Sequence, residues 1–161
     1  MKMSTSPGRI YFILFLALAI LVCSCKRNDN DVIPDRYVSF VMDISGDILF
    51  SDLNAIGNSV IITSQTNNWG SRSGGYDNNG IIVYRANLDQ FYAYDRTCPH
   101  DYAIDNKSVK VNVDFIQALC PVCSTAYSLP TGGIPISGPG KYPLKNYRTF
   151  FDGRYLSVEN Y

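Results

Sequence analysis

Three cysteines and the only histidine of this chain occur in two short segments that could together bind a metal. The segments are Cys98-Pro99-His100 and Cys120-Pro121-Val122-Cys123, separated by nineteen residues. Zinc and iron–sulfur sites use thiolate and imidazole ligands, commonly with two ligands on each of two tight loops. The proline of each segment restricts its own φ and biases the preceding cysteine toward an extended conformation. The spacing therefore predicts one metal site that both segments share.

The two segments and their flanks resemble the Rieske iron–sulfur proteins. The family pattern is Cys-x-His, a spacer of similar length and then Cys-x-x-His, so this chain departs from it only at Cys123. Residues 91–97 lead into the first segment as the strand before a Rieske loop does. The features that follow the second segment in the family's order are Tyr127-Ser128-Leu129, Gly132-Gly133, Gly138-Pro139 and Pro143-Leu144. The resemblance extends over residues 36–161.

This resemblance implies an all-β fold: a small antiparallel β-sandwich or barrel with a cluster-binding subdomain formed by two hairpin loops. It also implies a [2Fe–2S] cluster and one-electron transfer with a redox partner protein. The implied ligands are Cys98, His100, Cys120 and Cys123. Around the cluster, the resemblance points to Ser124, Thr125 and Tyr127 as hydrogen-bond donors and to Pro139 in a lid over the site.

A cysteine in place of the second histidine changes the charge of the predicted cluster. The oxidised core is neutral with two thiolates and carries one negative charge with three, and negative charge disfavours reduction. We expect a potential between those of Rieske centres, about −150 to +300 mV, and of plant-type ferredoxins, about −400 mV.

Two other functions use the same residues. Three cysteines and one histidine are a common closed set for structural Zn²⁺, which would make the chain a binding module, as would a metal-free Rieske fold. The Cys120–Cys123 pair is also a Cys-x-x-Cys motif, which outside the cytoplasm forms a disulfide or a redox dithiol. The sequence leaves these alternatives open.

Residues 1–24 are typical of a lipoprotein signal peptide. Lys2 and Arg9 precede an apolar run over 10–23, which at fourteen residues is too short to span a bilayer. The following Val22-Cys23-Ser24-Cys25 resembles a lipobox and makes Cys25 the predicted lipidation site. The alternative is an anchor helix that is never cleaved.

The predicted signal peptide also indicates where the protein is located and which metal it could acquire. We expect a lipid-anchored protein of the cell envelope, at the outer membrane because Lys26 rather than an aspartate follows Cys25. Residues 1–24 contain no twin-arginine pair, so we expect export of an unfolded chain. Such a chain acquires its metal outside the cytoplasm, which favours zinc or no metal.

The remaining chain predicts a tether and one domain. Residues 25–35 are polar, as in a flexible linker, and 36–161 are long enough for one core. Without Lys2 and Arg9, 12 of the 14 basic residues remain against 14 acidic ones, which argues against a nucleic-acid partner. No nucleotide motif or catalytic constellation is visible, so an electron carrier or binding module is expected rather than a stand-alone enzyme.

Eight runs rich in Val, Ile, Tyr and Phe are predicted to form strands, and no stretch shows helical periodicity. The runs are 37–43, 59–64, 80–85, 90–95, 107–113, 115–119, 144–151 and 154–158. Asp152-Gly153 predicts a tight hairpin between the last two. The long segment 65–79 contains the single tryptophan, Trp69, which we expect to cover an edge of the barrel, with partner docking as the alternative.

Overall fold

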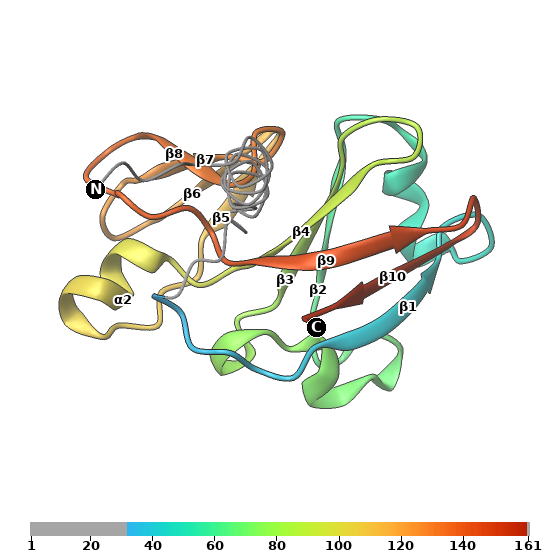
Figure 1. The fold of residues 1–161 in the computed structure, drawn as a ribbon, viewed down its shortest axis with the longest axis horizontal. Helices are drawn as coiled ribbons and strands as arrows, with labels where there is room; N and C mark the ends of the chain where they lie inside the picture. Colours follow the sequence, from blue (N-terminus) through green and yellow to red (C-terminus); the bar gives the residue numbers. More distant parts are fainter. Residues whose placement is uncertain (1–31, 161) are drawn as a thin grey trace, which may run out of the picture.

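The computed structural model describes residues 32–160, which form two antiparallel β-sheets (Figure 1). This arrangement confirms the predicted all-β class. The predicted signal peptide and Cys25 lie outside the described residues. Between residues 32 and 160, no helix has the length and apolar character needed to cross a membrane.

The larger sheet has six strands in the order β1-β10-β9-β4-β3-β2. They are β1 (Ser39–Asp43), β2 (Ser59–Ile62), β3 (Ile81–Arg85), β4 (Phe91–Asp95), β9 (Asn146–Phe151) and β10 (Tyr155–Glu159). Each begins and ends within two residues of a predicted run. Alternating burial along β1 and β10 explains why their sequences were recognisable, because only one face of each contacts the core.

The smaller sheet has four short strands in the order β5-β6-β7-β8. They are β5 (Asn112–Asp114), β6 (Gln117–Leu119), β7 (Ala126–Ser128) and β8 (Ile134–Ser137). The sequence did not predict β7 and β8, and only the end of the run over 107–113 is a strand. Three or four residues are too few for a clear alternation. Pro135 also weakens the β8 signal, although a proline is tolerated there because β8 lies at the sheet edge.

Within residues 32–160, one α-helix and four 3₁₀-helices connect the strands, whereas no helix was expected. They are η1 (Ile48–Asn54), η2 (Thr66–Asn68), η3 (Gly70–Ser73), η4 (Tyr76–Asn78) and α2 (Pro99–Asp105). Helix α2 begins with Pro99 at its first position, where a missing N–H costs nothing, and ends at Asn106 in the left-handed conformation. Seven residues are too few for periodicity to reveal a helix.

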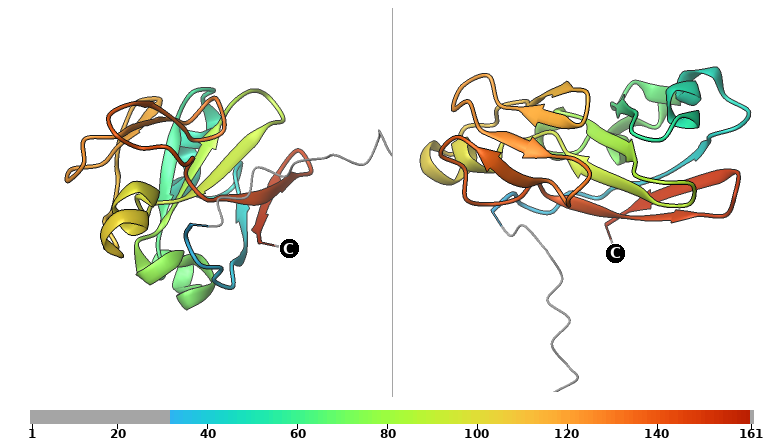
Figure 2. Two further views of the ribbon diagram at one scale, coloured as in Figure 1. Left: turned by 60° about the vertical axis from the view of Figure 1, so that its left-hand side comes forward. Right: turned by 90° about the horizontal axis from the view of Figure 1, so that it is seen from above.

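Strands β3 and β4 bury both of their faces. Ile81 and Val83 contact one buried cluster, which includes side chains from β1, β9, β10 and η1. Ile82 and Tyr94 point the other way, into a second cluster with residues of the smaller sheet. This second cluster contains Cys98 and Cys120 and therefore connects the predicted metal site to the core. Figure 2 shows α2 and the smaller sheet at the same end of the molecule.

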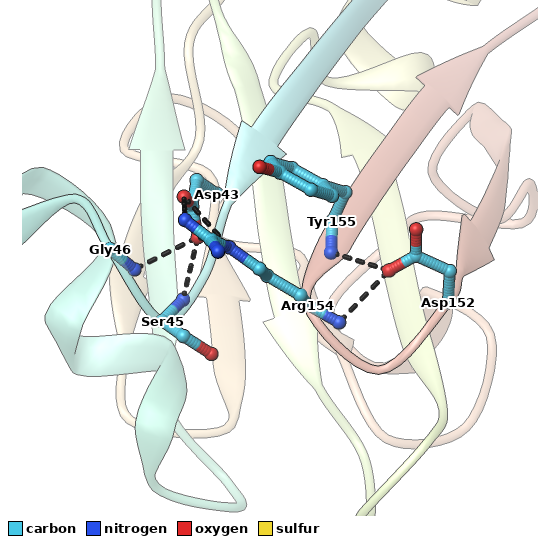
Figure 3. Close-up of polar contacts among 6 residues, drawn as sticks. All are labelled: Asp43, Ser45, Gly46, Asp152, Arg154 and Tyr155. Carbon is cyan, nitrogen blue, oxygen red and sulfur yellow. Dashed lines mark hydrogen bonds and ion pairs between the residues drawn. The ribbon is translucent and has the colours of Figure 1, made fainter.

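The β9–β10 hairpin turns at Asp152-Gly153, as predicted, with Gly153 at φ 103°. Asp152 accepts hydrogen bonds from the backbone N–H groups of Arg154 and Tyr155 at 2.9 and 2.7 Å. The guanidinium of Arg154 pairs with Asp43 at 2.6 Å, and Asp43 also accepts from the following turn (Figure 3). The pair joins the end of β1 to the hairpin.

Trp69 is half-buried and stacks on Phe40 and Phe50, with ring centroids 5.0 and 5.9 Å apart. Its ring therefore extends the first core cluster. This packing supports the interpretation that Trp69 covers an edge of its own domain.

Candidate metal site

Three thiols and one carboxylate lie together beside the smaller sheet. The ligand atoms of Cys98, Asp101, Cys120 and Cys123 all lie within 4.8 Å of one another. The Sγ atoms of Cys98 and Cys123 are 3.6 Å apart, and the Cys120 thiol donates to Oδ2 of Asp101 at 2.8 Å. All three cysteines are free thiols. Such a group suits a thiophilic metal.

The first half of the site is held by the end of β4 and the start of α2. The N–H of Cys98 donates to the carbonyl of Val109 at 2.8 Å, and the Cys98 carbonyl accepts from Tyr102 at 3.2 Å. Cys98 is the N-cap residue of α2 and has an extended conformation. The first cysteine is therefore followed by a helix rather than by a hairpin loop. The helix determines which side chain of its first turn, His100 or Asp101, faces the other thiols.

The second half of the site is the loop between β6 and β7. Cys120 donates its N–H to the Thr125 carbonyl at 2.9 Å, and its own carbonyl accepts from Ser124 at 3.1 Å. Ser124 has a φ of 59°, which reverses the chain after Cys123. This tight turn brings Cys120 and Cys123 to the same side and matches the hairpin loop predicted from the sequence.

His100 and Asp101 are adjacent in the first turn of α2, but they are placed differently. Asp101 is 6% exposed and belongs to the thiol group, whereas His100 is half-buried and is not part of that group. One helical residue rotates a side chain by about 100° about the axis. Sequence reasoning missed Asp101, although a proline at the first helical position followed by an acidic residue in the first turn is a helix-start signal.

The predicted neighbours of the site differ in their contacts. The Tyr127 hydroxyl lies 3.3 Å from Sγ of Cys98, and Oγ1 of Thr125 accepts from the Cys123 thiol at 3.2 Å. Ser124 and Pro139 are exposed. The loop containing Pro139 nevertheless contacts the site, because the N–H of Gly140 donates to Oγ1 of Thr125 at 3.0 Å.

Burial sets the protonation of these groups. It raises the pKa of the Cys98 thiol to about 11, and burial together with the bond to Asp101 raises the pKa of Cys120 as well. Burial also opposes ionisation of Asp101, but the thiol donors, Cys120 first, outweigh it and lower the pKa of this carboxyl. Without a metal, the site therefore holds neutral Cys98 and Cys120 thiols around a charged carboxylate.

No protein-family model matches the sequence, and no curated protein matches it. Among solved structures, the chain is similar to the ferredoxin of carbazole 1,9a-dioxygenase from Nocardioides aromaticivorans IC177, with a TM-score of 0.44 and 16% identity over 79% of this chain and 100% of that one. It is also similar to a chain in the complex of reduced oxygenase and oxidized ferredoxin in carbazole 1,9a-dioxygenase. The TM-score is 0.45, with 18% identity over 78% of this chain and 95% of that one. A third similar structure is the Sphingomonas yanoikuyae B1 ferredoxin. The TM-score is 0.35, with 18% identity over 50% of this chain and 74% of that one.

Proposed function

We propose that this chain is a Rieske-like electron carrier in which Cys98, Cys120 and Cys123 bind a [2Fe–2S] cluster. The observation that supports the proposal is the convergence of three thiols from two separate segments at one point of the core. The fourth ligand comes from the first turn of α2, which carries both His100 and Asp101. When bound, the cluster supplies a one-electron redox couple.

The donor set fits a metal group of this kind. Thiolates are the usual ligands of iron–sulfur clusters, and Cys98 and Cys120 are 0% and 1% exposed. The Tyr127 hydroxyl can donate to the Cys98 sulfur and thereby stabilise negative charge there. Val122, between the cysteines of the second segment, is 61% exposed, so a redox partner protein can approach the buried site over that residue.

Metal and sulfide analysis tests the proposal. The protein would be isolated without oxygen from its native host, and its iron, zinc, sulfide and visible absorption measured. We expect about two irons and two sulfides per chain, with a charge-transfer band that disappears on reduction. One zinc and no visible absorption would contradict an electron carrier.

Structural Zn²⁺ is the second candidate, and the compactness of the site favours it. All four donor atoms lie within 4.8 Å of one another, as around a single tetrahedral ion. The chain would then be a binding module in which the metal ties α2 to the β6–β7 loop.

We further propose that lipidation of Cys25 anchors the domain to the cell envelope, at the outer membrane, through the polar segment that follows this residue. The sequence of the leader supports this proposal. Cys25→Ser should move the protein from the membrane fraction to the soluble fraction and abolish incorporation of radiolabelled palmitate. Cys23→Ser is the matched control and should remain anchored, since this residue leaves with the leader. Loss of anchoring only in the Cys23 variant would contradict the assignment.

A further inference from the structure

We infer that Asp101 is the fourth ligand of the metal centre, which is then a Cys3Asp site. The inference rests on the proposed function only in requiring that the three thiolates bind a metal. The observation behind it is that a carboxylate, and not the imidazole, lies inside the thiol group.

The start of α2 explains this placement. Cys98 is the N-cap residue and Asp101 follows it by three positions, so both lie on one side of the first helical turn. Cys120 and Cys123 have the same spacing in the opposing loop. Each half of the site therefore presents two donors three residues apart. His100 is rotated by about 100° from Asp101 around the helix.

Asp101 is a buried carboxylate whose hydrogen-bond donor is a thiol of the same group. The residue is 6% exposed, and its Oδ2 accepts from the Cys120 thiol at 2.8 Å. The ion pairs found within residues 32–160 join Lys107, Lys145 and Arg154 to other carboxylates, so no basic side chain there pairs directly with Asp101. A buried carboxylate is costly unless a cation or strong donors compensate its charge. The Cys120 thiol is such a donor, and a metal ion bound among the thiols would be such a cation.

Metal binding itself changes the role of Asp101. Each thiol that forms a metal–sulfur bond releases its proton to solvent, so Cys120 can no longer donate to the carboxylate. Asp101 would then face three thiolates at short range, which is repulsive unless the carboxylate also binds the ion. Four anionic donors around a divalent ion leave the net charge of an ordinary four-cysteine zinc site.

The spacing of the thiols also suits a single tetrahedral metal ion. A metal–sulfur distance of about 2.3 Å in a tetrahedral site places neighbouring sulfurs about 3.8 Å apart. The Sγ atoms of Cys98 and Cys123 are 3.6 Å apart in the structure. A single thiophilic divalent ion therefore fits with little rearrangement of the backbone.

Titration of the full chain with Co²⁺ alone tests the inference. The protein would be purified metal-free, in detergent and with a reductant, and followed by its sulfur-to-cobalt charge-transfer and visible ligand-field bands. Asp101→Asn should weaken Co²⁺ binding at least about tenfold, since the loss of even an indirect partner of a metal ligand has that effect. It should also alter the ligand-field bands. His100→Asn should bind like the unmodified chain, as should Asp105→Asn, which removes an exposed carboxylate from the same helix.

A second variant keeps the test decisive if Asp101→Asn does not fold. Asp101→Cys adds a fourth thiolate, so it should bind Co²⁺ and raise the charge-transfer intensity by about one third. Unchanged binding in Asp101→Asn, or no added intensity in Asp101→Cys, would overturn the inference. Loss of binding in His100→Asn alone would identify His100 as the ligand and leave the proposed function standing. Failure of the unmodified chain to bind Co²⁺ would overturn the inference, whereas the iron and sulfide analysis decides the proposed function separately.

Discussion

At the scale of single residues, Tyr127 is placed to tune the proposed metal centre. Its ring is fully buried, and its hydroxyl lies 3.3 Å from Sγ of Cys98. Burial raises the pKa of Tyr127, so the hydroxyl stays protonated and remains a donor. A hydrogen bond to a cluster thiolate stabilises the more negative, reduced state and raises the potential.

Tyr127→Phe should therefore lower the reduction potential of the proposed cluster. A bond worth about 1 kcal/mol corresponds to about 40 mV for a one-electron couple. A redox titration followed by visible absorption measures the change, with Tyr142→Phe, at an exposed position, as the control. Equal potentials in the two variants would show that the hydroxyl does not act on the cluster.

The identity of the fourth ligand also affects the potential. With His100 the oxidised cluster would carry one negative charge, as the sequence predicts, whereas with Asp101 it would carry two. The second value equals that of a plant-type ferredoxin, whose potential is about −400 mV. A measured potential near that figure agrees with ligation by Asp101, and a clearly higher one agrees with His100.

At the scale of elements, the loop over 138–140 is tied closely to the second cysteine loop. A Cβ on Gly138 would lie 2.7 Å from Cα of Thr125 and 2.8 Å from the Ser124 carbonyl oxygen. Gly138 also has a φ of 81°, which side chains disfavour. Only glycine allows this approach, so the loop covers the turn that presents Cys120 and Cys123.

Gly138→Ala should destabilise the domain and loosen the metal site. Gly153→Ala is a matched control, because Gly153 has a φ of 103° but no neighbouring atom within 4 Å of the place that a Cβ would take. We expect Gly153→Ala to cost about 1 kcal/mol from backbone strain. Gly138→Ala should cost about 1–3 kcal/mol more, since the contacted backbone must shift. Urea denaturation compares the two free energies of unfolding, and equal losses would argue against a closely packed lid.

Elements of the site differed in how well the sequence predicted them. The turn between Cys120 and Cys123 was predicted, because Pro121 restricts the backbone between the two cysteines. Helix α2 was not, since its seven residues give no periodic signal. Missing the helix meant missing Asp101, whose role depends on a helical turn that places it beside Cys98.

At the scale of the whole molecule, an exposed ion pair joins the first strand to the last hairpin. Arg154, through its hydrogen bond, holds the pKa of the Asp43 carboxyl below its usual value of 3.8. The stabilisation is therefore fully present above that value and is lost as the pH falls through the lowered pKa. Both side chains are accessible to solvent, so the effect on stability is small and sensitive to salt.

Asp43→Asn should accordingly reduce stability at neutral pH and have less effect in acid. Urea denaturation at pH 7 and at about pH 3, with and without salt, measures the difference between the variant and the unmodified chain. Asp89→Asn, at an exposed position in another turn, controls for the loss of one negative charge. A difference that grew on acidification would contradict the sign expected for a lowered pKa.

The strands of the larger sheet, the β9–β10 hairpin and the convergence of the cysteines could be predicted from sequence alone. Alternating burial, turn residues and the rarity of cysteine are local signals, readable without a structure. Tertiary structure decided what surrounds the thiols. The smaller sheet forms from strands of three or four residues, which pack against the second buried face of β3 and β4. That packing places α2 so that its first turn directs Asp101, and not His100, toward the three sulfurs.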